Sequence, residues 1–288
     1  MAPAVTTGEM VSAVIADLTG RIDQRLPAAV ADEPDGVHRL RTSVRRLRTV
    51  LSEFDGQLRR RPTKELRHQL GDLGAVLGVA RDLEVRADLC DAVLERVDLA
   101  RLRPDLVAPL RAEHDGAHRT FAAWCDGVAA RALMGTLGDW GAAPPLKRAD
   151  RSAVKVARRL VLARADRTLA LVPAALPSEA LAATPPEALH ELRKQARRLR
   201  HVAEAVTKPP AEVLGEDVAV LGAAGSAIQS TLGDHRDALL LAEYVEGVAP
   251  AAAPYASVAA EAREQACAAL SALPADVERL AEARSAMG

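Results

Sequence analysis

Apolar residues recur every three to four positions along almost the whole chain, and no convincing run alternates apolar and polar residues. A period near 3.6 is typical of helices that bury one face, whereas strands alternate with a period of two. The pattern therefore predicts an all-α protein. Breaks that contain proline or glycine separate the helices, and residues 139–145 divide the first four from the last four. The predicted helices span residues 8–30, 33–56, 63–97, 104–138, 148–172, 185–207, 212–246 and 254–284.

Two sequence patterns occur twice. H-x-x-R-x-x-x-R-R-L-R stands at residues 38–48 and again 152 positions later at 190–200, and L-G-x-x-R-D stands at 77–82 and again at 232–237. Two matches at nearly one spacing indicate an internal duplication. We therefore predict two tandem four-helix bundles related by a pseudo-twofold axis. They form a single domain over residues 1–288, with a first half at 1–138 and a second half at 148–288.

The basic residues of each eleven-residue motif form a stripe that borders the apolar face of its predicted helix. Arg46 and Arg198 lie away from this stripe. Like charges four residues apart cost an isolated helix about 0.2–0.5 kcal/mol per pair, and residues 38–48 contain no acid. Either carboxylates from other helices or a bound anion must offset the repulsion. The stripes consist of His38, Arg41, Arg45 and Arg48 in the first copy and His190, Arg193, Arg197 and Arg200 in the second, with Lys194 beside it.

Basic residues on other predicted helices extend this candidate anion site. The row on helix 148–172 has only a weak counterpart in the first half, so we expect the second side to carry more charge. Helix 63–97 also aligns three glycines with its arginines, which indicates close helix approach or clearance beside the arginines, and plain helix packing explains the glycines better than ligand contact. The additional candidates are Arg21, Arg25, Lys64, Arg67, Arg81, Lys155, Arg158, Arg159 and Arg236.

Composition narrows the function classes. The net charge is −1, so a polyanion-binding function must rest on local clustering, and 33 of the 38 basic residues are arginine, which binds phosphate bidentately. Only 2% of the residues are aromatic. The three cysteines show no C-x-x-C spacing, which favours reduced thiols and a cytoplasmic location. No signal peptide and no membrane span are predicted.

The doubled motif on helices, together with L-G-x-x-R-D, resembles the CHAD family, the conserved histidine α-helical domain. The resemblance covers essentially the whole chain. It implies two four-helix bundles and the binding of inorganic polyphosphate in a basic central groove or pore. No E-x-E-x-K signature of a triphosphate-tunnel domain is present, so we expect a non-catalytic module without cofactors that acts in the cytoplasm, with polyphosphate granules as a target. The implied ligand-binding residues are His38, Arg41, Arg45, Arg46, Arg48, His190, Arg193, Arg197, Arg198 and Arg200.

Other function classes agree less well with the residues. Single-stranded nucleic acids usually stack on aromatic side chains, and this chain has six, so nucleic-acid binding is a less favoured alternative. His114 and His118 are spaced for zinc, but the H-E-x-x-H order is absent and a solvated helix face explains them better. A helical scaffold for protein partners remains an alternative to polyphosphate binding.

Overall fold

A computed structural model describes residues 5–172, 184–249 and 253–288 of the chain. Within these residues the regular structure is helical, apart from isolated β-bridges, which confirms the predicted all-α class. No helix in the described ranges combines the length and apolar character that a membrane crossing requires. The helices are α1 (Thr7–Val30), α2 (Gly36–Glu53), α3 (Arg60–Arg96), α4 (Arg103–Cys125), α5 (Val128–Ala142), α6 (Ala153–Leu169), α8 (Pro186–Thr207), α9 (Glu216–Val248), α10 (Ala253–Leu270) and α11 (Leu273–Ser285).

The fourth predicted helix of each half is interrupted. Predicted helix 104–138 divides at Asp126 and Gly127 into α4 and α5, and predicted helix 254–284 divides after Leu270 into α10 and α11. Gly127 adopts an extended backbone, which is compatible with ending one helix and starting the next. The two breaks fall at corresponding places in the element order. The duplication itself stays a prediction.

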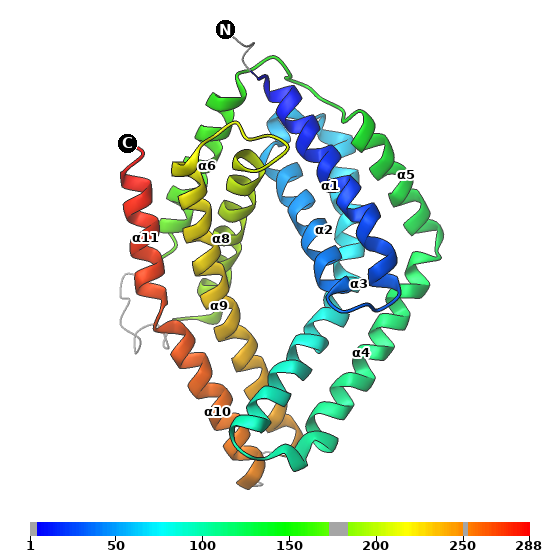
Figure 1. Cartoon of the computed structure of the whole chain (residues 1–288), viewed down its shortest axis with the longest axis vertical. Helices are drawn as coiled ribbons and strands as arrows, with labels where there is room; N and C mark the ends of the chain where they lie inside the picture. The colour runs from blue at the N-terminus through cyan, green and yellow to red at the C-terminus, as the bar shows by residue number, and fades with distance from the viewer. Residues whose placement is uncertain (1–4, 173–183, 250–252) are drawn as a thin grey trace.

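The two halves face each other across the middle of the molecule. In Figure 1, α1–α5 lie on one side and α6–α11 on the other, with α2 and α8 towards the middle. The halves meet first where α2 packs against α8 and where short backbone bridges join Thr6 to Ser152 and Leu58 to Leu146. They meet again at the far end, where α3 and α4 share a buried apolar cluster with α9 and α10. The space between these two contacts holds the candidate site.

Candidate functional site: a basic central cavity

Helices α2 and α8 carry the two copies of the eleven-residue motif, and they pack against each other. Their apolar sides are fully buried: Leu40 and Leu47 on α2 and Leu192 and Leu199 on α8 are 0% exposed. Because each basic stripe borders this buried face, burial of the leucines directs the stripe towards the space between the halves. The structure thereby brings together side chains that are about 150 residues apart in sequence.

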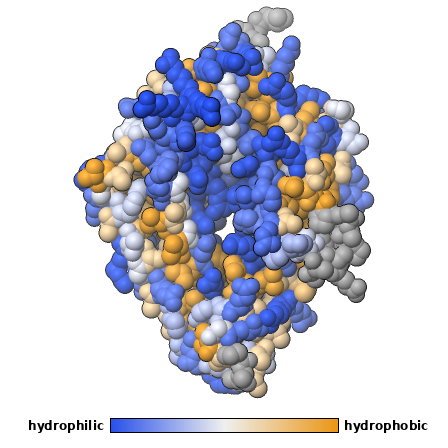
Figure 2. All heavy atoms as spheres, turned by 180° about the vertical axis from the view of Figure 1, so that it is seen from behind, coloured by the Kyte–Doolittle hydropathy of each residue, from blue (hydrophilic) through white to orange (hydrophobic). Residues whose placement is uncertain are grey.

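A cavity of about 600 Å³ opens between α2, α3, α8 and α9, and we call it the central cavity. Seven arginines and two aspartates line it, so its formal charge is five positive when the histidines are neutral. Figure 2, which shows the molecule from the side opposite to Figure 1, has an opening near its centre with hydrophilic residues around it. The lining residues are His38, Arg41, Thr42, Arg45, Arg81, Asp82, Val85, Arg86, His190, Arg193, Arg197, Gln229, Arg236, Asp237 and Leu240.

Several arginines of the stripes have no ion-pair partner among the described residues. Arg45, Arg48, Arg193 and Arg197 lie in no salt bridge there, and Nε of Arg193 is buried without a hydrogen-bond partner. Burial, reinforced by the nearby Arg197, lowers the pKa of Arg45 to about 9. Burial also lowers the pKa of Arg197 to about 10, with Arg193 adding to the effect. Carboxylates of neighbouring helices therefore offset the repulsion only in part.

The aspartates of the L-G-x-x-R-D pattern lie among these arginines. Asp82 on α3 accepts a hydrogen bond of 2.9 Å from Nη1 of Arg41 on α2. Asp237 on α9 lies near Arg193, and burial raises the pKa of its carboxyl. From the sequence, the pattern indicated only a duplication, and the partial neutralisation of the arginine stripes by its aspartates was not predicted. The sequence did contain a signal for this role: an aspartate recurs at the same place in both copies, and in each half it lies near a cationic stripe.

Both motif histidines line the central cavity and are exposed to solvent. Burial lowers the pKa of His38, and Arg81 lowers it further. Burial lowers the pKa of His190 in the same way, followed by the effect of Arg236. Both shifts favour the neutral imidazole, and a bound polyanion would raise the pKa of each histidine by supplying negative charge.

Glycines on α3 and α9 give arginine side chains room beside the cavity. A Cβ atom added at Gly78 would lie 3.5 Å from Nη2 of Arg41, and one at Gly233 would lie 3.1 Å from Nη2 of Arg193. Clearance beside arginines, one of the two explanations that the sequence offered, therefore applies at these positions. Gly222 fits the other explanation, because it lies against the backbone and side chains of α8.

Several predicted site residues lie outside the central cavity, some on other faces of their helices and some, such as Arg48 beside Gly71 and Gly74 of α3, farther along the same helix. Arg46 and Arg200 both pair with Glu204, on the opposite side of α2 and α8. Arg25 donates a hydrogen bond of 2.6 Å to Ser43, between α1 and α2. The full set that lines no part of the central cavity is Arg21, Arg25, Arg46, Arg48, Lys64, Arg67, Lys155, Arg158, Arg159, Lys194, Arg198 and Arg200.

The predicted basic row of the second half lies on the outer face of α6. Lys155, Arg158 and Arg159 line a separate, shallow hollow, and Arg158 donates a hydrogen bond of 2.8 Å to the carbonyl of Met287. The expectation that this row adds charge to the second side of the groove is therefore wrong. The apolar side of α6 packs against α8 and α11, which turns the row outwards.

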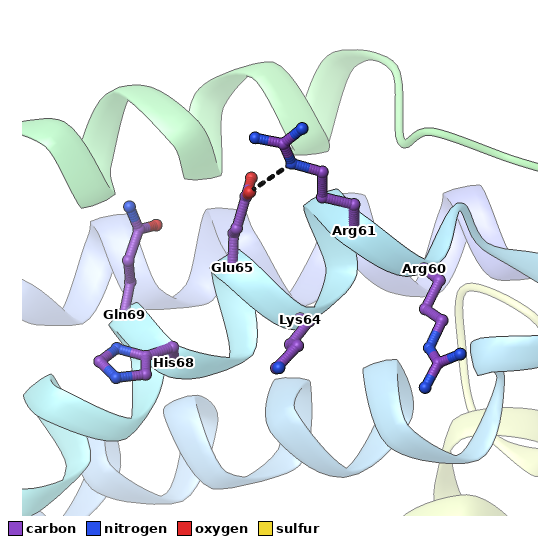
Figure 3. Close-up of a pocket in the computed structure, with 6 residues that line it drawn as sticks. All are labelled: Arg60, Arg61, Lys64, Glu65, His68 and Gln69. Atoms are coloured by element: carbon purple, nitrogen blue, oxygen red, sulfur yellow. Dashed lines mark hydrogen bonds and ion pairs between the residues drawn. The ribbon is translucent and has the colours of Figure 1, made fainter.

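Lys64 lies in another hollow along the start of α3. Figure 3 shows Arg61 and Glu65 joined by an ion pair of 3.0 Å, while Arg60 and Lys64 point away from that pair. Arg67 is exposed on the same helix and close enough to Arg48 to lower the pKa of its guanidinium, although burial is the larger cause. These residues form a surface beside the central cavity and not part of its wall.

The expectation that His114 and His118 lie on a solvated helix face is wrong, because His114 is buried and His118 is partly buried. Their rings stack at 6.3 Å, and Nε2 of His118 lies 2.9 Å from the carbonyl oxygen of Ala29. Within the part of the chain that the structure describes, no three histidine, cysteine or acidic side chains gather as a metal site would require.

Comparison with solved structures supports the fold. PptA from Streptomyces chartreusis aligns with a TM-score of 0.71 at 19% identity, covering 96% of this chain and 99% of its own. The CHAD domain from the plant Ricinus communis aligns with a TM-score of 0.72 at 22% identity, covering 99% of this chain and 94% of its own. At these identities the likeness is one of architecture.

Comparison with sequences gives the family. Two uncharacterized proteins from two strains of Mycobacterium tuberculosis are 28% identical over 234 residues, which covers 76% of this chain. The match covers 41% of each relative, so the chain spans about two-fifths of their length. The family model for the CHAD domain matches residues 13–246. Since that match takes in most of the chain, the protein belongs to the CHAD domain family.

Proposed function

We propose that the protein binds inorganic polyphosphate in the central cavity. The observation that carries the proposal is the excess of unpaired cations on its wall, above all Arg45, Arg193 and Arg197. Burying like charges together destabilises a fold unless counter-charge arrives. A chain of phosphates supplies such charge at regular intervals, and arginine binds phosphate through two parallel hydrogen bonds.

The wall of the cavity favours a polyanion without bases. Among its described lining residues the rings are those of His38 and His190, so it offers no Phe, Tyr or Trp on which nucleobases could stack. The cavity wall also has few hydrogen-bond acceptors for a base, and the carboxylate of Asp82 already forms an ion pair with Arg41. This composition supports polyphosphate as a ligand better than single-stranded nucleic acid.

A titration at two salt concentrations tests the proposal. The protein is mixed with long polyphosphate, single-stranded RNA and duplex DNA at 50 and 200 mM salt. We expect polyphosphate to bind most tightly and its affinity to fall roughly 100-fold between the two conditions, because neutralising several phosphates releases counterions. Equal or tighter binding of either nucleic acid would contradict the proposal.

Two double variants, one in the central cavity and one on the outer face of α6, test where polyphosphate binds. Replacing Arg45 and Arg197 by Gln removes two unpaired cations of the central cavity, and we expect at least a tenfold loss of polyphosphate affinity. Replacing Lys155 and Arg159 by Gln removes the same charge from the outer face of α6 and should change affinity less than threefold. If both double variants lose affinity equally, general surface charge and not the cavity binds the polymer.

We also propose that binding is not coupled to hydrolysis and that the protein associates with polyphosphate granules. Incubation with polyphosphate and Mg²⁺ should release no phosphate above the level of the Arg45 and Arg197 double variant. A fluorescent fusion should colocalise with granules, and the double variant should stay diffuse. Phosphate release that depends on the intact cavity would instead indicate an enzyme.

A further inference from the structure

A second cavity adjoins the central cavity and differs from it in chemistry. It has a volume of about 550 Å³ and lies between the start of α8 and the middle of α9, and we call it the side pocket. The two cavities share His190, Arg193 and Arg236. A molecule could therefore occupy the side pocket while its charged end reaches the arginines of the central cavity.

Leucines form much of the side pocket. Leu189 and Leu232 are 6% and 2% exposed, and Leu239 and Leu240 are partly buried beside them. A ligand made only of phosphate gains nothing from such a wall, because phosphate loses hydration there without finding a partner. Apolar or heteroaromatic surface gains by leaving water. The side pocket thus suits the organic part of a molecule that also carries phosphate.

One position in the wall of the side pocket differs in chemistry between the two halves. In the repeated L-G-x-x-R-D register, Leu239 corresponds to Glu84. Glu84 forms an ion pair of 2.9 Å with Arg81, three residues before it. Arg236, the counterpart of Arg81, has no ion pair among the described residues, because a leucine stands where its partner would be. The second half therefore combines an apolar wall with an unpaired arginine.

We propose that the side pocket binds the base and ribose of a nucleoside polyphosphate whose phosphates extend to Arg193 and Arg236. The inference rests on the proposed function only in assigning those arginines to phosphate. A volume of about 550 Å³ lies in the range of small-ligand sites and is too small for a diacyl lipid. The carboxylates of Glu187 and Glu243 at the pocket can accept hydrogen bonds from the amino groups of a base, whereas they would repel the phosphate of a lipid headgroup.

Calorimetric titrations with ATP and with inorganic triphosphate test the inference, because the two ligands carry similar charge and differ in the nucleoside. We expect ATP to bind at least about tenfold more tightly. Leu239→Gln makes the wall polar without changing charge, and Leu239→Glu restores the residue of the first half and gives Arg236 a partner. Both substitutions should remove the preference for ATP. Val220→Gln, at an exposed position on the same helix, should leave it unchanged.

The outcomes separate this inference from the proposed function. If long polyphosphate binds and ATP binds no better than triphosphate, the side-pocket inference is overturned and the proposed function stands. If ATP is preferred but the Leu239 variants keep that preference, the nucleoside binds elsewhere and the inference is also overturned. If neither ATP nor polyphosphate binds, the proposed function fails as well. Binding to vesicles that contain phosphatidic acid, without binding to ATP, would also overturn the side-pocket inference.

Discussion

Arg45 and Arg46 are adjacent in the chain, yet their side chains lie in opposite electrostatic surroundings. Arg46 pairs with Glu204 on the side of α2 that faces away from the central cavity. Arg45 projects into the cavity, where burial and Arg197 lower its pKa to about 9. A rotation of about 100° per residue along a helix is enough to separate the two environments. A stabilising ion pair and a destabilising charge thus stand side by side in one motif.

Removing the unpaired charge should make the ligand-free protein more stable. We expect Arg45→Met to raise the free energy of unfolding by about 1–2 kcal/mol in phosphate-free buffer, since a partly buried charge without an ion-pair partner is replaced by an apolar chain. The same variant should gain less stability than the wild type from added polyphosphate. Chemical denaturation with and without the polymer measures both effects. Arg39→Met, at an exposed position on the same helix, should change stability by less than about 0.5 kcal/mol. Destabilisation by Arg45→Met would show that Arg45 has a favourable partner.

His201 on α8 is a second buried group that the cationic surroundings affect. It is 5% exposed, and its Nδ1 lies 3.2 Å from the hydroxyl oxygen of Thr49 on α2. Burial lowers its pKa well below the usual value, and neighbouring arginines lower it further. Four guanidinium groups act on His201, two from each motif helix: Arg45 and Arg46 on α2, and Arg197 and Arg200 on α8. Glu204 forms ion pairs with Arg46 and Arg200.

Acid should therefore weaken the fold through His201. Because the folded-state pKa lies below that of the unfolded chain, near 6.5, the unfolded chain takes up the proton first. The effect is absent above that pH, and stability should fall by up to about 1.4 kcal/mol per pH unit below it. His201→Gln should flatten the decline measured by denaturation between pH 7.5 and 5. His68→Gln, which changes an exposed histidine, should leave it intact. An unchanged slope in His201→Gln would contradict the assignment.

At the scale of helices, α3 and α9 approach the motif helices through glycines, and the available space differs between the two sides. Alanine at Gly78 places its Cβ at ordinary contact distance from Arg41, whereas at Gly233 the Cβ lies 3.1 Å from Arg193 and the guanidinium must shift. Each substitution also removes the cost of a glycine inside a helix, about 1 kcal/mol.

The two alanine variants should therefore behave differently. We expect Gly78→Ala to stabilise the protein by about 0.5–1 kcal/mol and to leave polyphosphate affinity within twofold. Gly233→Ala should gain less stability and lose affinity by about three- to tenfold, because Arg193 is displaced. Gly135→Ala, in open space on α5, provides the reference for helix propensity alone. Equal affinities in all three variants would show that Arg193 does not depend on the glycine.

The sequence predicted the helices and the stripes because both follow from local periodicity. The apolar face of α2 determines where Arg41 and Arg45 point, and the structure places both in the cavity. The rotation of α6 depends on its packing against α8 and α11, so the position of Arg158 could not be read from its own helix. The break at Gly127 was missed because the apolar period continues on both sides of it.

At the scale of the whole molecule, two contacts close the space around the central cavity. One is the packing of α2 on α8; the other is the apolar cluster at the far end, where the hydroxyl of Tyr244 donates a hydrogen bond of 2.9 Å to the carbonyl of Leu106. Near the first contact, Arg164 on α6 donates to Glu53 on α2 at 2.5 Å and to Gln195 on α8 at 2.6 Å. These side chains join the halves through buried charge.

Breaking this buried pair on one side should uncouple the halves. Arg164 and Glu53 are 10% and 5% exposed, so either Arg164→Met or Glu53→Leu alone should cost about 3–5 kcal/mol by leaving a buried charge unpaired. The double variant should recover most of that loss. A double-mutant cycle by chemical denaturation measures the coupling, with Arg61→Met at an exposed ion pair as a control that should cost less than about 1 kcal/mol.

The number of steps in the unfolding transition tests whether the buried pair of Arg164 and Glu53 joins the two halves. If the buried pair joins the halves into one cooperative unit, the wild type should unfold in a single step seen alike by all probes, and Arg164→Met should separate it into two. The variant that separates the halves should also bind polyphosphate less tightly, because Arg45 and Arg197 stand on opposite halves and must face the same chain. Additive single-variant costs, with one unfolding step throughout, would show instead that the apolar contacts alone hold the cavity together.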